Sequence, residues 1–370
     1  METLWRHGGD VVTVVSPMVD QSEFAFRELC RRYGAQLCYT PMIHAKLFLS
    51  DTTYRSQRLQ KDLLETNQPV VVQFAGDDPS TLLEAARLVE GRACAVDLNL
   101  GCPQPIARKG HYGSFLLREH DTIVSILQTW SQSVSVPFTA KIRLIDEGSK
   151  DPDDRGLQAT LRLVDQIEAA GASAITVHGR NRIMTGRKTG SADWNAIAAI
   201  KRRVNVPVIA NGNIECFQDV AACAQATGAD GVMSAEALLE NPALFNGPTR
   251  ICPFQLTREY LSLAHAFPSW NFHRVEKAHV ARLLHNPMRQ LTRQSIDAAG
   301  ILAPCATPDQ LAQAVDDIET AFRSSTACTS QYALVDNWYR RHRLESMELD
   351  RQKRKEVQQK WLAGGLRLTR

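Results

Sequence analysis

Short β-branched runs alternate with longer amphipathic stretches from residue 11 to about residue 245, a pattern typical of repeated βα units. Eight runs read as strands, at residues 11–15, 36–39, 70–74, 95–99, 138–143, 174–178, 208–210 and 231–234. Helical patterns lie between them, at residues 23–32, 80–89, 158–170, 194–203 and 218–227. Eight strands that alternate with helices predict an α/β protein with a closed (β/α)8 TIM barrel.

Beyond the barrel pattern, three apolar-periodic stretches predict a small C-terminal helical domain, at residues 256–266, 275–295 and 308–322. We therefore expect a barrel domain at 1–250, a helical domain at 251–330 and a basic tail at 331–370. The tail contains Arg351-Gln352-Lys353-Arg354-Lys355. Such a run suits RNA binding, nuclear import or the solvated face of a helix, and the sequence does not choose among them.

Composition narrows the class of protein. The chain has 370 residues, 44% hydrophobic and 22% charged, as in ordinary globular proteins. Its 43 basic and 40 acidic residues leave a net charge of +3, so affinity for nucleic acid has to come from local patches. The nine cysteines form no Cys-x-x-Cys pair, which argues against a zinc or iron-sulfur site, and no metal is expected. Without a signal-peptide pattern or a run of about 20 apolar residues, a soluble cytoplasmic or nuclear protein is expected.

The active site of a TIM barrel lies at the carboxyl ends of its strands, and polar residues gather there in this sequence. Lys141 and Arg143 end the fifth predicted strand and point to the same side, because side chains alternate along a strand. Two cations at one strand end predict a negatively charged ligand. The segments 211–213 and 234–236 occupy the loops after the seventh and eighth strands, which commonly bind phosphate in these barrels.

Two of these signals have ordinary structural interpretations as well. The Asn211-Gly212 pair is a common turn sequence. His178 fits a hydrogen-bonded core histidine, although its position at a strand end favours the site.

Cys102 follows a buried-strand pattern within Asp97-Leu98-Asn99-Leu100-Gly101-Cys102-Pro103-Gln104. A cysteine in this position is often a small buried hydrophobe. Here Gly101 allows a ligand to approach the backbone, and Pro103 fixes the turn that aims the thiol. Asn99 adds hydrogen-bonding groups. A packing role and a reactive role both remain open on these residues alone.

The strand ends resemble, in order, the motifs of the tRNA-dihydrouridine synthases, most closely the eukaryotic type that acts on positions 16 and 17. The matching segments are 16–22, 36–42, 72–74, 97–104, 141–143, 176–180, 210–214, 232–236 and 241–245. The resemblance is dense over residues 11–250 and loose afterwards. Three positions depart from it: Ser16 and Ser114 replace a common alanine, and Ala237 replaces a glycine.

The resemblance implies an FMN enzyme that uses NADPH to reduce the C5–C6 double bond of uridine to 5,6-dihydrouridine in the D loop of tRNA, at positions 16 and 17. Hydride would pass from flavin N5 to C6, and Cys102 matches the general acid that protonates C5. A thiol with an ordinary pKa of about 8.5 holds its proton at neutral pH, as this role requires. The barrel would be the FMN-binding catalytic domain and residues 251–330 the tRNA-binding domain.

By the same resemblance, eleven residues would bind the cofactor: Pro17, Met18, Val19, Gln73, Lys141, His178, Asn211, Gly212, Asn213, Ala235 and Glu236. Asn99, Arg143 and Arg180 would bind the substrate.

Basic residues offer places for tRNA phosphates. One group follows the sixth strand, at Arg180, Arg182, Arg187 and Lys188. A second group, Arg282, His285, Arg289 and Arg293, recurs at helical spacing and predicts a basic stripe on one helix face. Such a face is commonly only solvated, and the resemblance favours phosphate contact.

Two other functions fit parts of the pattern. An FMN-barrel reductase of a free pyrimidine or an enone would turn over small substrates without RNA. A non-catalytic tRNA-binding factor would lack flavin and keep its RNA function after Cys102→Ala.

Overall fold

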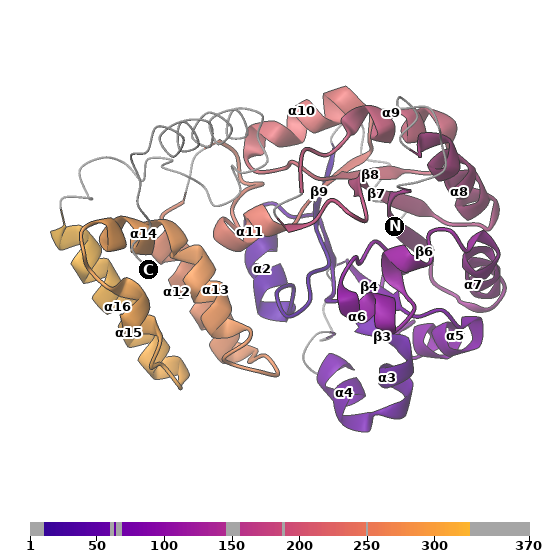
Figure 1. Ribbon diagram of the computed structural model, residues 1–370. Coiled ribbons are helices and arrows are strands. Elements are labelled where there is room, and N and C mark those ends of the chain that lie inside the picture. The colour runs from indigo at the N-terminus through magenta and orange to yellow at the C-terminus, as the bar shows by residue number, and fades with distance from the viewer. Residues whose placement is uncertain are drawn as a thin grey trace, which may run out of the picture.

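The computed structural model describes residues 11–59, 63, 69–145, 156–186, 189–248 and 251–325. Neighbouring strands all pair in parallel, in the order β2-β1-β9-β8-β7-β6-β5-β4, and pairing of β2 with β4 closes the barrel. The barrel strands are β1 Val12–Val15, β2 Leu37–Tyr39, β4 Val70–Ala75, β5 Ala95–Leu100, β6 Phe138–Leu144, β7 Ala174–Asn181, β8 Val208–Asn211 and β9 Gly231–Ser234. The TIM-barrel prediction is confirmed (Figure 1).

One further strand escaped the sequence pattern. β3 Ile43–His44 contains two residues and pairs in parallel with the end of β4. A segment this short has no detectable alternation of apolar and polar positions. It belongs to the connection after β2, which also contains α3 Ala45–Ser50 and α4 Thr52–Gln57.

The remaining barrel helices are α2 Phe24–Arg32, α5 Pro79–Arg87, α6 Pro105–Lys109, α7 His120–Ser133, α8 Leu157–Ala169, α9 Trp194–Arg203, α10 Phe217–Thr227 and α11 Glu236–Glu240. Local sequence explains several of the starts. Asp78 accepts a hydrogen bond from the backbone N–H of Thr81 at the start of α5, and Asp193 accepts one from Ala196 at the start of α9. Such caps satisfy N–H groups that have no partner within the helix.

The barrel interior changes character along its axis. Val14, Leu37, Val71 and Ile209 form a buried apolar cluster with neighbouring side chains. Closer to the carboxyl ends of the strands the inward residues are polar, and Gln73, Asp97, Thr139 and Thr176 are fully buried there. Polar groups buried in this way need hydrogen-bond partners, so this half of the interior is constrained by polar contacts beneath the expected site.

The C-terminal helices are α12 Pro253–Ala266, α13 Glu276–Leu283, α14 His285–Arg293, α15 Ala298–Leu302 and α16 Pro308–Ser324. They lie to one side of the barrel, where α12 packs against α2 (Figure 1). The division into domains at residue 250 stays a prediction. The tail at 331–370 lies outside the described residues. Every described helix is too short or too polar to cross a membrane.

The prediction of one helix over residues 275–295 is wrong. The chain leaves helical geometry at Leu284, with φ −92° and ψ 10°, and α14 begins at the next residue. Pro287 supplies the reason, because its ring has no N–H and clashes with the carbonyl four residues earlier in a continuous helix. Arg282 therefore lies on α13, whereas His285, Arg289 and Arg293 lie on α14, and the four do not form a stripe on a single helix.

Candidate active site

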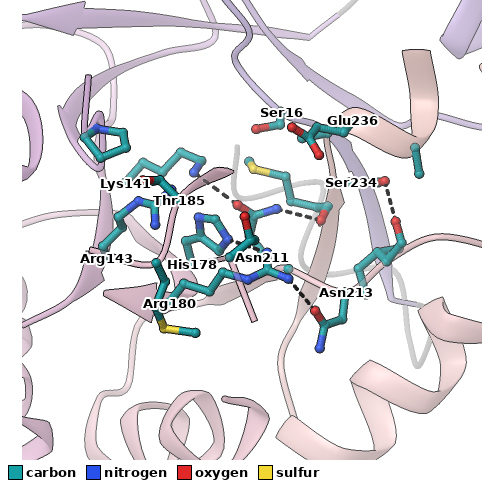
Figure 2. Close-up of a pocket in the computed structure, with 18 of the residues that line it drawn as sticks. Ser16, Lys141, Arg143, His178, Arg180, Thr185, Asn211, Asn213, Ser234 and Glu236 are labelled. Carbon is teal, nitrogen blue, oxygen red and sulfur yellow. Dashed lines mark hydrogen bonds between the residues drawn. The ribbon is translucent and has the colours of Figure 1, made fainter. Parts of the chain in front are cut away.

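A cavity of about 460 Å³ lies at the carboxyl ends of the barrel strands, within the usual size range for small-molecule sites (Figure 2). Its wall brings together nine of the predicted site residues: Lys141, Arg143, His178, Arg180, Asn211, Gly212, Asn213, Ala235 and Glu236. These side chains come from β6, β7, β8, β9 and the loops that follow them. Residues far apart in the sequence therefore converge on one space.

Three cations of this wall are buried. Lys141 and Arg143 are each 9% exposed, and Arg180 is 6% exposed. The Lys141 Nζ donates to Asn211 Oδ1 at 3.1 Å. Arg143 donates to the carbonyl oxygen of Gly101 at 2.9 Å and to that of Asn181 at 2.8 Å. These acceptors are uncharged, so the positive charge remains available to an anion in the cavity.

Burial and mutual repulsion disfavour the charged forms of Lys141 and Arg143. Burial, together with the neighbouring Arg143, lowers the pKa of Lys141 to about 8. Burial and the charge of Arg180 likewise lower the pKa of Arg143. Both groups are destabilised as cations by this environment, and an anionic ligand would relieve that cost.

Arg180 on β7 connects its own strand to the loop after β8. Its Nη1 lies 3.0 Å from His178 Nε2, and its Nη2 donates to Asn213 Oδ1 (Figure 2). Because a guanidinium only donates, His178 Nε2 is an acceptor here and the imidazole carries its proton on Nδ1. His178 is thus a neutral side chain in the cavity wall, held by a neighbour from its own strand.

The loop after β8 is shaped for close packing. Gly212 has φ 115°, and a Cβ atom there would lie 2.7 Å from the Cβ of Ala192. Asn213 also has positive φ, at 63°. Ser234 at the end of β9 donates through Oγ to the carbonyl oxygen of Ile214 at 2.8 Å, which links this loop to the next. Asn211 ends β8 and Gly212 lies at the bend that follows it, and both residues form part of the cavity wall. Their role in binding a ligand stays a prediction.

The departure at Ala237 has no backbone consequence. It lies within α11 and is absent from the described residues with positive φ, so an alanine fits there without strain.

Cys102 lies beside the cavity, on the loop whose next two residues, Pro103 and Gln104, form part of its wall. Asn99 Oδ1 accepts hydrogen bonds from the backbone N–H groups of Gly101 at 3.0 Å and Cys102 at 2.9 Å. Burial raises the pKa of the Cys102 thiol, although a backbone hydrogen bond and the nearby cations oppose the shift. The thiol therefore keeps its proton at neutral pH, which suits an acid better than a nucleophile.

A second loop packs against Cys102 from the other side. Gly113 has φ 69°, and a Cβ atom there would lie 2.7 Å from the carbonyl oxygen of Cys102. That oxygen accepts from the backbone N–H of Ser114 at 3.1 Å and from its Oγ at 2.9 Å. Ser114, which stands where the related family commonly has alanine, thus adds a hydrogen bond to the loop that carries the thiol.

The remaining predicted residues lie outside the cavity wall. Pro17 and Met18 are half-buried after β1, Val19 is 56% exposed, and their neighbour Ser16 is the residue of this segment that reaches the wall. Gln73 is fully buried. Of the basic loop after β7, Arg187 and Lys188 lie outside the described residues.

Sequence reasoning missed one polar residue beneath the site. Asp97 is fully buried, accepts from Gln73 Nε2 at 2.9 Å and from Thr139 Oγ1 at 2.6 Å, and has a pKa that burial raises to about 6. Its signal was a carboxylate between Val96 and Leu98 in an otherwise apolar run. Among the described residues, no His, Cys, Asp or Glu side chains gather in threes in a way that suits a metal ion.

Residues 13–333 match the family model described as dihydrouridine synthase (Dus). The chain is 44% identical over 276 residues to a mouse protein named tRNA-dihydrouridine(16/17) synthase [NAD(P)(+)]-like, covering 75% of this chain and 56% of the mouse protein. It is 48% identical over 243 residues to the tRNA-dihydrouridine(16/17) synthase [NAD(P)(+)] of Saccharomyces cerevisiae, covering 64% and 55%.

A human protein named tRNA-dihydrouridine(20a/20b) synthase [NAD(P)+]-like is 37% identical over 247 residues, covering 65% of this chain and 73% of the human protein. The chain spans little more than half the length of the mouse and yeast relatives.

Proposed function

Because the chain belongs to the dihydrouridine synthase family, we propose that it reduces the C5–C6 double bond of uridine to 5,6-dihydrouridine in the D loop of tRNA. FMN is the proposed cofactor and NADPH the proposed reductant. Positions 16 and 17 are the proposed targets, since relatives named for these positions are 44% and 48% identical, against 37% for the relative named for 20a/20b.

One observation carries the proposal: three buried cations, Lys141, Arg143 and Arg180, face a single cavity, and Cys102 sits on the adjoining loop with its proton retained. An anionic ligand fits the cations, and a proton donor beside that ligand fits a reduction that ends in protonation of carbon.

The buried cations and the loops of the cavity wall support FMN as the proposed ligand. The loops at 211–213 and 234–236 meet where TIM barrels commonly bind phosphate, and the absence of a side chain at Gly212 lets the backbone pack closely there. Lys141 and His178 would hold the polar parts of the ring system and its chain. When bound, reduced FMN supplies a hydride for C6 of the uracil ring.

The chain's own residues supply the rest of the chemistry. Addition at C6 leaves negative charge on the uracil carbonyl oxygen and requires a proton at C5, which the Cys102 thiol is proposed to donate. Arg143 donates to the carbonyl oxygen of Gly101, so a cation lies against the loop that carries the thiol. In that position it would stabilise the charge that develops on the uracil. Asn99 would act chiefly by holding the loop, because its amide oxygen already accepts from the loop N–H groups and its NH₂ group donates to Gln73.

The tRNA has to present an unstacked uridine to this cavity, which requires a grip on the surrounding backbone. Residues 251–330 are proposed to provide part of that grip. The family match extends to residue 333, and Arg289 and Arg293 on α14 are exposed. Their positive charge suits phosphate contact.

The decisive experiment incubates the purified chain with NADPH and unmodified tRNA, records its visible spectrum and maps dihydrouridine in the product. We expect flavin absorbance and product at positions 16 and 17. Cys102→Ala should keep the flavin and lose most of the turnover, whereas Cys252→Ala, a cysteine at the start of α12, should behave as the native chain.

Other outcomes select other functions. Turnover of free uracil or an enone without tRNA would favour a small-molecule reductase. A colourless protein that binds tRNA and leaves it unchanged after FMN is added would favour the non-catalytic factor.

A further inference from the structure

A chain of side-chain hydrogen bonds runs through the barrel interior toward the thiol. Thr139 Oγ1 donates to Asp97 Oδ1 at 2.6 Å, and Gln73 Nε2 donates to Asp97 Oδ2 at 2.9 Å. Gln73 Oε1 then accepts from Asn99 Nδ2 at 2.7 Å. Asn99 Oδ1 accepts the backbone N–H of Cys102 at 2.9 Å. Asp97 is thus connected to the Cys102 loop through two amide side chains.

Strand register creates the chain. Gln73 lies opposite Asp97 across β4 and β5, and Asp97 lies opposite Thr139 across β5 and β6. All three side chains are fully buried. A buried carboxylate costs stability that a well-packed apolar side chain would not cost. Its presence here therefore calls for a role beyond packing.

The carboxylate of Asp97 determines which way the amide groups of Gln73 and Asn99 face. An ionised carboxylate only accepts hydrogen bonds, so Gln73 has to turn its NH₂ group toward Asp97 and its oxygen toward Asn99. Asn99 must then turn its NH₂ group toward Gln73, which leaves its oxygen for the N–H groups of Gly101 and Cys102. Reversal of Asn99 would place its NH₂ group against the N–H groups of the loop. Reversal of Gln73 alone would place its oxygen against the carboxylate of Asp97 and its NH₂ group against the NH₂ group of Asn99.

We propose that Asp97 is a positioning residue that fixes, through Gln73 and Asn99, the orientation of the loop that holds the Cys102 thiol. This inference rests on the proposed function only in giving Cys102 the role of acid. Burial raises the pKa of Asp97 to about 6, so the carboxylate that sets the direction is present at pH 8.

The test measures alkylation of Cys102 by iodoacetamide in the purified 370-residue chain, at pH 8, by mass spectrometry of the cysteine-containing peptides. Cys252 serves as internal reference, since it is the N-cap residue of α12 and lies outside the barrel strands that carry these hydrogen bonds. Because the thiol is partly buried, release of its loop should raise its rate. Loss of one buried hydrogen bond corresponds to a change of about fivefold.

Asp97→Leu should raise the Cys102 rate relative to Cys252 by about fivefold, and Asp97→Asn, which can still accept from Gln73, should raise it less. Gln73→Met removes the hydrogen bonds of Gln73 with Asp97 and Asn99, so it tests the same series of hydrogen bonds if Asp97→Leu does not fold. In the Gln73→Met background, Asp97→Leu should add nothing further. Thr139→Val is the matched control, because it removes a hydrogen bond from Asp97 on the side away from the thiol, and it should leave the rate unchanged.

Native rates in folded Asp97→Leu and Gln73→Met would overturn the proposal. An equal increase in Thr139→Val would overturn it as well, because general loosening of the interior would then explain the effect. Neither flavin turnover nor tRNA enters the measurement. If the native chain forms no dihydrouridine in a parallel assay, the proposed function fails, and the alkylation rates still decide the role of Asp97.

Discussion

Glu23 and His279 meet in a buried contact between the barrel and the C-terminal helices. Glu23 Oε2 lies 2.9 Å from His279 Nε2, with side chains 5% and 0% exposed. Tyr260 donates to the other carboxylate oxygen at 3.0 Å, and the ring of Phe26 stacks on His279 with centroids 4.5 Å apart. Burial raises the pKa of Glu23, but attraction and hydrogen bonds from His279 and Tyr260 outweigh it and leave the pKa below its usual value.

Removal of the His279 side chain should show how much the contact with Glu23 contributes to the stability of the protein. We expect His279→Ala to lower the free energy of unfolding by about 3 kcal/mol, because the carboxylate of Glu23 stays buried with one partner fewer. Urea denaturation at pH 7 measures the change. His273→Ala, at an exposed histidine in the same region, should cost less than about 0.5 kcal/mol. Equal stability of the two variants would contradict the prediction.

Lys141 predicts a dependence of stability on alkaline pH. Its pKa is about 8 in the folded chain and 10.5 as the reference value, so between these values the unfolded chain binds more protons. Unfolding free energy should therefore rise as pH increases from 8 to 10.5, by an amount on the order of 2 kcal/mol. Chemical denaturation across this range should show the rise in the ligand-free native chain and not in Lys141→Met.

Loss of the proton from Lys141 should weaken the binding of an anionic ligand, although it raises the stability of the fold. Since an anion in the cavity favours the charged lysine, affinity for FMN should fall as pH rises above 8. Fluorescence titration of FMN at several pH values measures this. Lys46→Met, at an exposed lysine on α3, should keep the native trend, and an affinity that does not change with pH would contradict the role of Lys141.

Gly212 provides a test of the proposed phosphate loop. A Cβ atom there would meet the Cβ of Ala192 at 2.7 Å and His178 Cδ2 at 3.1 Å, so Gly212→Ala should shift the loop and lower FMN affinity by about tenfold or more. Gly247 is a matched control, since its φ of 113° is close to the 115° of Gly212 and nothing lies within 4 Å of its Cβ position. Gly247→Ala carries the same backbone strain and should keep native affinity in the same titration. Equal loss in both would trace the effect to strain and not to the loop.

The barrel was predictable because its signal is local and repeated. Each strand ends within a few residues of its predicted end, and the polar residues at those ends converge on one cavity as parallel strands require. Pro287 was a local signal for the break before α14. The apolar period continues across it over residues 275–295, so the period alone predicted a single helix. β3 had none, since two residues carry no period.

The role of Asp97 could not be read from the sequence. Its identity is visible there, but its partners follow from strand register, which sets Gln73 and Thr139 on either side of it. Sequence spacing does not specify that register across three strands. The same holds for the contact of Glu23 with His279, because it depends on how the C-terminal helices pack on α2.

The close packing of Gly113 against Cys102 allows a test of the proposed role of Cys102 as the acid. Gly113→Ala would bring a Cβ atom to 2.7 Å from the carbonyl oxygen of Cys102 and 2.9 Å from its Cβ, at a backbone φ of 69° that disfavours alanine. The loop has to move, and displacement of a catalytic group by about 1 Å can cost up to a hundredfold in rate. We expect dihydrouridine formation to fall by about tenfold to a hundredfold while the visible spectrum of bound flavin is retained. Gly91→Ala, at a position with nothing within 4 Å and no positive φ, should keep native turnover, and native turnover in Gly113→Ala as well would show that the placement of Cys102 does not limit the reaction.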